Sequence, residues 1–145
     1  MKTRYVLGIV IDPATGFVVG ITKKKGPAFL LGKVTFPGGK LEGNESAQAA
    51  MTRELAEEAG IDVPERDWRV LSYSETDDYT LTKLVAESSK VLHARTREQE
   101  PIWHLAIKSH LRFAATQPNQ YAPDFLADLT QALAVLNPVP VAVTA

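Results

Sequence analysis

Cysteine is absent from this chain of 145 residues. The chain therefore has no disulfide bonds and no thiolate metal site, which fits a reducing compartment. An excess of charge of one sign is also absent, since the net charge is −1. Such a chain has no overall basic field to attract a nucleic acid polymer. No apolar run approaches the ~20 residues of a membrane-spanning helix, so we expect a soluble protein that does not enter a membrane.

The composition that remains is ordinary for one globular domain. Hydrophobic residues make up 45% of the chain and charged residues 23%, both typical of soluble proteins. The opening segment, MKTRYVLGIVID, is too short and too polar at its flanks to be a signal peptide. We therefore expect a single cytoplasmic domain over residues 1–145, with residues 137–145 as a loosely held tail that contains two prolines.

Hydrophobic patterning predicts several strands and two helices. Apolar and β-branched runs predict strands at residues 4–11, 17–22, 34–36, 68–75, 80–87 and 101–108. The first two are joined by a proline- and glycine-containing turn, which predicts a hairpin. Helical spacing predicts helices at 46–59 and 124–136. Residues 88–95 fit either a short helix or a turn, and 116–123 a polar loop. This order predicts a mixed sheet covered on both faces, an α/β/α sandwich.

The chain is organised around residues 36–61, FPGGKLEGNESAQAAMTRELAEEAGI. Either Asn44 or Ser46 is expected to cap the N-terminus of the helix in this stretch. Gly60 occupies the position where a helix commonly ends in a left-handed residue. Three apolar residues at i, i+4 and i+8 are expected to pack on the sheet, namely Met51, Leu55 and Ala59.

Three carboxylates are expected to share one face of this helix. Glu54, Glu57 and Glu58 stand at i, i+3 and i+4, and residues at these spacings are neighbours on a helix surface. Like charges repel there, and the C-terminal end of the helix dipole disfavours anions further. A hard cation such as Mg²⁺ or Mn²⁺ would reverse this penalty, because it binds carboxylate oxygens. An acidic helix face alone is usually only solvated, so the surrounding residues decide the interpretation.

The flanking residues supply what a phosphate-binding metal site needs. Arg53 is placed to brace a carboxylate in fork geometry, with Glu45 as the candidate. The glycine pair at residues 38–39 is interpreted as a turn whose backbone approaches a ligand closely and offers a carbonyl to a metal. Lys33 and Lys40 flank this pair and, with its second glycine, are expected to contact substrate phosphates.

The joint pattern resembles the Nudix box, G-x5-E-x7-R-E-U-x-E-E-x-G-U, where U is apolar. Gly39, Glu45 and the run from Arg53 to Ile61 match every fixed position over 23 residues. The preceding residues 36–38 also resemble this family. The resemblance implies the family's α/β/α sandwich fold and covers most of the chain, although only the box is specific.

The resemblance also implies a reaction and roles for residues. Nudix hydrolases cleave a nucleoside diphosphate linked to another group, by attack of water at phosphorus with Mg²⁺ or Mn²⁺. At the matching positions Glu57 and Glu58 would be metal ligands, and Glu54 a ligand or the general base. Arg53 would orient the glutamates, and the carbonyl of Gly38 would complete the metal shell.

Two residues outside the box are candidates for the additional acid that family members often recruit. Glu100, or alternatively Glu98, precedes the strand predicted at 101–108 and is expected to join the metal site. Trp103 on that strand is expected to be a core residue, although base stacking is an alternative. Residues 119–121 occupy a region in which relatives contact a base.

The substrate is less well defined by the sequence. The small size and the run GKVTFPGGKLE resemble MutT-like enzymes, which convert a (deoxy)nucleoside triphosphate to a monophosphate and pyrophosphate. The alternative within the family is an ADP-ribose or dinucleotide pyrophosphatase. An alternative of another class is a non-catalytic module that binds a nucleotide. In each case the expected partner is a small-molecule nucleotide, and the chain is a monomer or a homodimer.

Overall fold

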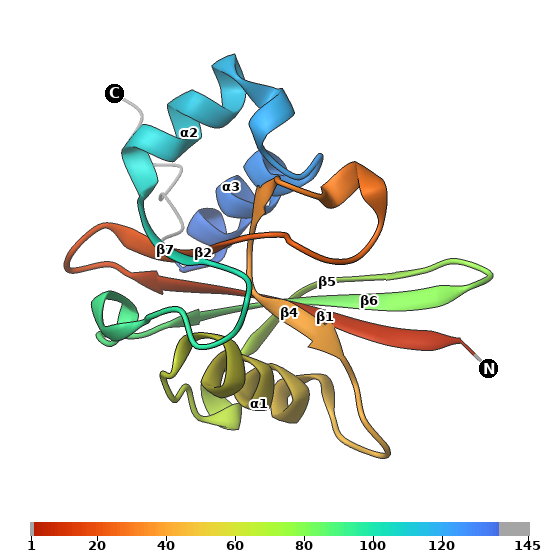
Figure 1. Cartoon of the computed structure of the whole chain (residues 1–145). Helices are drawn as coiled ribbons and strands as arrows, with labels where there is room; N and C mark the ends of the chain where they lie inside the picture. Colours follow the sequence, from red (N-terminus) through yellow and green to blue (C-terminus); the bar gives the residue numbers. More distant parts are fainter. Residues whose placement is uncertain (1, 137–145) are drawn as a thin grey trace, which may run out of the picture.

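A seven-stranded mixed sheet forms the centre of the computed structural model, which describes residues 2–136 (Figure 1). The predicted tail at 137–145 lies outside the described residues. The strands along the main path are β3 (Val34–Thr35), β2 (Phe17–Thr22), β1 (Thr3–Asp12), β6 (Tyr79–Glu87) and β5 (Arg69–Glu75). Two further strands pair beside this path, β4 (Gly38–Lys40) with β1 and β7 (Ile102–Ala106) with β2.

Strand β1 holds the sheet together because it pairs with three other strands. It runs parallel to β6, from Thr3 opposite Tyr79 to Ile11 opposite Glu87, and antiparallel to β2 and β4. Alternate residues of a strand point to opposite faces of the sheet. β1 accordingly contributes to two separate hydrophobic clusters, one on each face. The predicted mixed sheet and the β1–β2 hairpin are confirmed.

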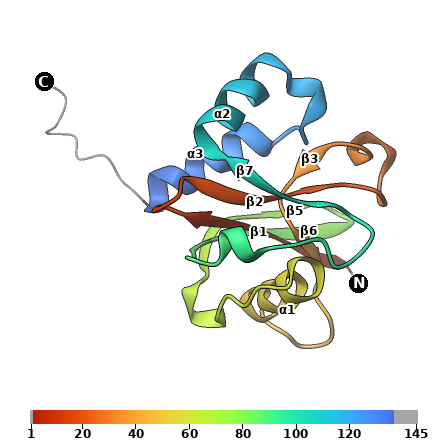
Figure 2. The ribbon, with the colours of Figure 1, turned by 60° about the vertical axis from the view of Figure 1, so that its left-hand side comes forward.

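Helix α1 (Ala47–Ala59) covers one face of the sheet alone (Figure 2). Its N-terminus is capped by Ser46, whose Oγ accepts a hydrogen bond from the Ala49 N–H at 3.0 Å. Its C-terminus ends at Gly60, which has a φ of 72°. The predicted apolar stripe is fully buried against the sheet. Packing is close enough that a Cβ on Gly8 of β1 would lie 2.6 Å from Cγ of Met51.

Helices α2 (Ile107–Thr116) and α3 (Phe125–Leu136) cover the opposite face (Figure 1). The Phe125 ring of α3 stacks on Phe36 with a centroid distance of 4.7 Å. No helix within residues 2–136 is long and apolar enough to cross a membrane. Four short 3₁₀ segments complete the described chain, at Ala28–Leu30, Glu65–Asp67, Val91–His93 and Pro118–Gln120. The third of these resolves the open choice at residues 88–95 as a short 3₁₀ turn.

Three predictions differ from the structure on this side. The strand predicted at 101–108 ends at Ala106, and α2, which was not predicted, follows directly. The apolar residues Ile107, Leu111 and Ala114 have helical spacing and all belong to or pack against the cluster under α2. Trp103 was expected in the core but is 47% exposed, with its indole N–H donating to Thr22 Oγ1 at 2.7 Å.

The interpretation of Gly38 and Gly39 as a turn is wrong, because they form strand β4. They lie opposite Leu7 and Val6 of β1, and neither is among the described glycines with positive φ. Glycine is required here for close approach rather than for a left-handed conformation. A Cβ on Gly38 would lie 2.2 Å from the carbonyl oxygen of Val6, and a Cβ on Gly39 would lie 2.4 Å from Oε1 of Glu54.

Candidate active site

The guanidinium of Arg53 lies at the centre of the acidic face of α1. It contacts Glu45 twice, with Nη2 2.6 Å from Oε1 and Nε 3.2 Å from Oε2. Nη1 donates to Glu54 Oε1 at 3.0 Å and to Glu57 Oε2 at 3.4 Å, and Nη2 donates to the carbonyl of Lys40 at 3.0 Å. The predicted brace between Arg53 and Glu45 is therefore confirmed. The same guanidinium also contacts two glutamates of the box and the end of β4.

This contact changes the ionisation of both partners. The hydrogen bond from Arg53 lowers the pKa of the Glu45 carboxyl below its usual range. The same hydrogen bond, with that to Glu54, raises the pKa of Arg53 above its ordinary value. Glu45 and Arg53 therefore remain an ion pair at neutral pH and fix the position of the guanidinium.

Glu58 lies in a different environment from the other two box carboxylates. Its side chain is only 6% exposed, and Oε1 is buried without a hydrogen-bond partner. Burial, and secondly the charge of Glu54, raise the pKa of Glu58 to about 8. A buried carboxylate oxygen without a donor is costly, and a bound cation would remove that cost. This orphaned oxygen fits the expected metal site.

Glu54 connects the helix to strand β4. Burial raises the pKa of Glu54, while the hydrogen bond from Arg53 opposes the rise. Its carboxyl group lies over Gly39, where any side chain would collide with it. Gly39 of strand β4 thus lies directly against a glutamate of the helix.

The carboxylates do not form a preassembled metal cage. Among residues 2–136, no three histidine, cysteine, aspartate or glutamate side chains are grouped as a ready cation site. The physical reason is that Arg53 occupies the space between Glu54 and Glu57, while Glu58 turns inward. The donors available are all oxygen atoms, which suits Mg²⁺ or Mn²⁺. Binding would require the side chains of Glu54 and Glu57 to move away from Arg53.

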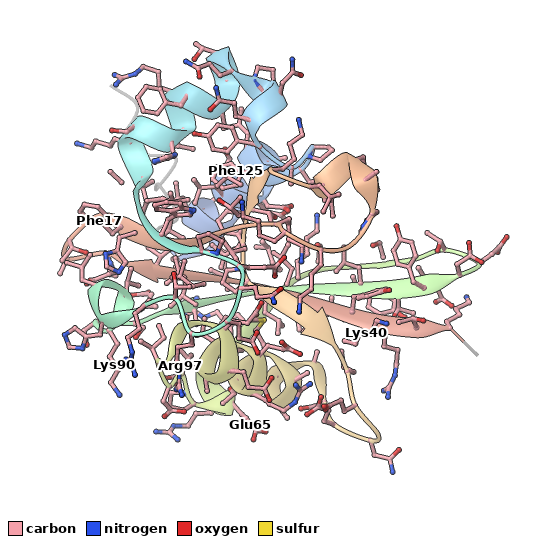
Figure 3. The ribbon with its side chains drawn as sticks, viewed as in Figure 1. Phe17, Lys40, Glu65, Lys90, Arg97 and Phe125 are labelled. Atoms are coloured by element: carbon pink, nitrogen blue, oxygen red, sulfur yellow. The ribbon has the colours of Figure 1, made fainter. Side chains whose placement is uncertain are left out.

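The two candidate acids outside the box lie beside α1 but differ in their contacts. The segment between the 3₁₀ turn at Val91–His93 and β7 runs against the end of the helix, where the Arg97 N–H donates to the carbonyl of Glu58 at 3.3 Å (Figure 3). Glu98 is exposed, and its charge contributes to the raised pKa values of Glu54 and Glu58. Glu100 is only 4% exposed and already accepts hydrogen bonds at both carboxyl oxygens.

The two candidate phosphate-binding lysines occupy different positions. Lys40 is exposed at the end of β4, and its carbonyl is bound by Arg53. Lys33 donates to the carbonyl of Asn119, which joins the segment before β3 to the start of the 3₁₀ turn at Pro118–Gln120. A third lysine, Lys23, contacts Glu100 at 3.2 Å, and its charge opposes the rise in the pKa of Glu58. The three consecutive lysines at 23–25 are the sequence feature that could have indicated this contact.

The acidic site does not coincide with an enclosed cavity. A cavity of about 530 Å³ lies at the end of the β1–β2 hairpin, between α2 and the end of α3. Its lining includes Ile11, Phe17, Ile107, Leu133 and Leu136 and none of the predicted site residues. This cavity is therefore not part of the candidate site.

Comparisons with known proteins found a matching family model and several similar sequences. The model of the NUDIX domain family matches residues 1–121. A 60-residue stretch is 46% identical to 8-oxo-dGTP diphosphatase of Escherichia coli (strain K12), covering 41% of this chain and 45% of that protein. A 62-residue stretch is 40% identical to 8-oxo-dGTP diphosphatase of Proteus vulgaris, covering 43% of this chain and 54% of that protein. The chain thus spans about half the length of the curated relatives it matches.

A solved structure shows the same fold. The NUDIX domain of Shewanella oneidensis NrtR, complexed with ADP ribose, superposes with a TM-score of 0.74 over 94% of this chain and 90% of that one. The sequence identity is 17%, so this similarity concerns the fold alone.

Proposed function

The chain belongs to the NUDIX domain family, and from this premise we propose that it is a metal-dependent pyrophosphohydrolase. The reaction is the hydrolysis of a phosphoric anhydride bond in a nucleoside diphosphate linked to another group. Water attacks phosphorus, one P–O bond of the anhydride breaks, and a proton is released. One observation supports this most strongly, namely the buried and orphaned carboxylate oxygen of Glu58 beside Glu54.

The proposed cation ligands are Glu54, Glu57 and Glu58, with the carbonyl of Gly38. Mg²⁺ or Mn²⁺ bound there would neutralise phosphate charge and lower the pKa of a coordinated water. Bringing a cation to Glu58 offsets the cost of its burial, which favours occupancy. Of the two acids outside the box, the exposed Glu98 is free to approach the cation.

Other residues of the chain support the chemistry from the protein side. Arg53 donates to both Glu54 and Glu57 and so holds the two carboxylates at the site when no metal ion is bound. Glu54 is mostly buried, with 16% of its side chain exposed, and has a raised pKa, which suits a carboxylate that accepts a proton from the attacking water. Gly39 leaves room for that carboxyl group, and Lys40 and Lys33 are proposed to bind the phosphates.

For the substrate we propose a (deoxy)nucleoside triphosphate, cleaved to a monophosphate and pyrophosphate. The support comes from the relatives named 8-oxo-dGTP diphosphatase, whose similarity reaches 46% over 60 residues. An ADP-ribose or dinucleotide substrate is the alternative within the family. A purely binding role is less favoured, because every charged position of the box is present in the chain.

A panel of nucleotides tests the proposal directly. Purified protein is incubated with 8-oxo-dGTP, dGTP, ATP, ADP-ribose and diadenosine polyphosphates, each with Mg²⁺, with Mn²⁺ and with EDTA. We expect pyrophosphate and a monophosphate from a triphosphate in the presence of metal and no product with EDTA. Preferential release of AMP from ADP-ribose would favour the alternative substrate. Tight nucleotide binding without any product would support the binding module.

A further inference from the structure

The carboxylate of Glu100 is the binding partner of a short basic segment, residues 23–25, which we call the lysine loop. Oε2 accepts from the backbone N–H of Lys24 at 2.8 Å and from that of Lys25 at 3.3 Å. The ammonium of Lys23 lies 3.2 Å from Oε2 and 3.4 Å from Oε1. One buried carboxylate therefore binds all three residues of the loop.

The loop is also fixed where it leaves the sheet. The Thr22 N–H donates to the carbonyl of Pro101 at 3.0 Å, immediately after Glu100 in the chain. On the other side, the Lys23 N–H donates to the carbonyl of Lys33 at 3.0 Å, and the Gly32 N–H donates back to Lys23 at 2.8 Å. The loop is therefore attached to Pro101 on one side and to the segment before β3 on the other, and Glu100 adds a third attachment.

The donors around Glu100 contrast with those around Glu58. Glu58 has a buried oxygen without a partner, whereas both oxygens of Glu100 have donors from the protein. A cation that took Oε2 of Glu100 would deprive the N–H groups of Lys24 and Lys25 of their acceptor in a part-buried position. Leaving such groups unpaired is unfavourable. A cation at Oε1 would lie beside the Lys23 ammonium, which is 3.4 Å from that oxygen.

We propose that Glu100 is a positioning residue, which fixes the lysine loop beside the acidic face of α1, and that it is not a metal ligand. Fixing the loop holds the Lys23 ammonium next to the carboxylates. The side chains of Lys24 and Lys25 are exposed. Glu100 fixes the backbone from which they extend, because it binds the N–H group of each residue. On the proposed function, the fixed loop contributes positive charge where the substrate phosphates must approach the carboxylates.

Two measurements, both starting from protein without metal or nucleotide, test this role. The first is Mn²⁺ binding, followed by the electron paramagnetic resonance signal of free Mn²⁺. The second is amide hydrogen exchange of residues 22–33. The variants are Glu100→Gln and Glu100→Ala, with Glu58→Gln and Glu98→Gln as matched controls that remove a carboxylate from the same region.

We expect Glu100→Gln to leave the Mn²⁺ dissociation constant within about twofold, and to speed exchange of the Lys24 and Lys25 amides about tenfold, since charge-assisted hydrogen bonds are lost. Glu100→Ala should speed exchange further. Glu58→Gln should weaken Mn²⁺ binding at least about tenfold without changing loop exchange. With an active substrate, Glu100→Gln should raise KM more than it lowers kcat.

The proposal would be overturned if Glu100→Gln weakened Mn²⁺ binding as much as Glu58→Gln does and left the exchange of the loop amides unchanged. Unchanged loop exchange in Glu100→Ala would overturn it as well. Failure of the proposed function gives a different result, because a wild type that hydrolyses no nucleotide still reports on Glu100 through loop exchange. A thermal unfolding curve for each variant identifies any that fails to fold. If one of the two Glu100 variants fails to fold, the other one tests the proposal.

Discussion

Arg53 and Glu45 form a two-point ion pair across eight residues, with contacts of 2.6 and 3.2 Å. Glu45 precedes α1 and Arg53 is the middle residue of that helix. The pair therefore fixes the guanidinium from outside the helix while its other donors hold Glu54 and Glu57. Glu45 thus fixes the group that contacts two glutamates of the box.

Removing the charge of Glu45 should affect activity more than stability. In Glu45→Gln the side-chain shape is kept, but one of the two contacts now places an N–H against the guanidinium. We expect kcat/KM to fall about tenfold, equivalent to about 1.4 kcal/mol, with the unfolding free energy changed by less than about 1 kcal/mol.

Glu42 offers a matched control, because its carboxylate lies 3.6 Å from Arg53 but is far more exposed. Steady-state kinetics of Glu42→Gln should remain within about twofold of wild type, since exposed pairs contribute little. Equal losses in the two variants would show that only the total charge around Arg53 matters.

The two glycines of β4 should respond differently to alanine. The Cβ of Gly38→Ala would meet the backbone of Val6, which cannot move aside. We expect a loss of at least about 2 kcal/mol in denaturant unfolding. The Cβ of Gly39→Ala would meet the end of the Glu54 side chain, which can rotate away.

Gly39→Ala should therefore fold with near-wild-type stability and lose most of its activity, because Glu54 is displaced. Chemical denaturation and turnover measured on the same samples separate the two effects. A Gly39→Ala protein that keeps full activity would remove Glu54 from the proposed site.

Glu58 should make the metal-free protein less stable as pH rises. Its pKa is raised to about 8 in the folded chain from an ordinary value of 4.5. The folded state therefore binds more protons than the unfolded state between these values, and stability falls as pH increases through that window. In EDTA, we expect Glu58→Gln to gain at least about 2 kcal/mol relative to wild type between pH 5 and pH 9.

The half-exposed Glu57 supplies the control for this pH dependence. Glu57→Gln removes a negative charge from the same helix at a half-exposed position, so it controls for the loss of charge alone. Thermal unfolding of all three proteins at both pH values is the measurement. If the stability difference between wild type and Glu58→Gln were the same at both pH values, the environment described for Glu58 would be contradicted.

A second ion pair, on the α3 side of the sheet, should be structural. Lys83 of β6 lies 3.0 Å from Asp128 of α3, and the two side chains are 12% and 9% exposed. Lys83→Met leaves the Asp128 carboxylate buried without its cation, so we expect a loss of about 3 kcal/mol in unfolding free energy.

The exposed neighbour Asp124 lies 3.3 Å from the same lysine and serves as the control. Asp124→Asn should change the unfolding free energy by less than about 1 kcal/mol. Replacing both buried partners, in Lys83→Met with Asp128→Leu, should recover part of the loss. If Lys83→Met is as stable as wild type, the buried pair contributes nothing.

Much of the site could be predicted because its signals are local. The caps of α1 at Ser46 and Gly60, its buried stripe and the contact between Arg53 and Glu45 depend on residues within about four helical turns. Spacing along a helix determines which of them meet. The β1–β2 hairpin and the mixed character of the sheet also followed from the order of the elements, whereas the pairing of β1 with β6 was not predicted.

The parts that could not be predicted depend on contacts that are distant in sequence. Gly38 and Gly39 are extended only because β1, more than 30 residues earlier, pairs with them. Glu58 shares a helix face with Glu54, yet it is buried because the segment before β7 covers that end of α1. The partners of Glu100 likewise lie 75 to 77 residues away. Helical spacing carries no information about such contacts.

The most direct test of the account compares wild type with Glu57→Gln across the nucleotide panel, with Mg²⁺ or Mn²⁺ and in EDTA. Glu57 is half-exposed and contributes to the site only through Arg53 and the proposed cation, so the variant should fold as stably as wild type or more so. We expect metal-dependent hydrolysis in wild type and its loss in the variant, by about 100-fold or more. Equal turnover of the two proteins on every nucleotide would contradict the claim that these carboxylates carry out the hydrolysis.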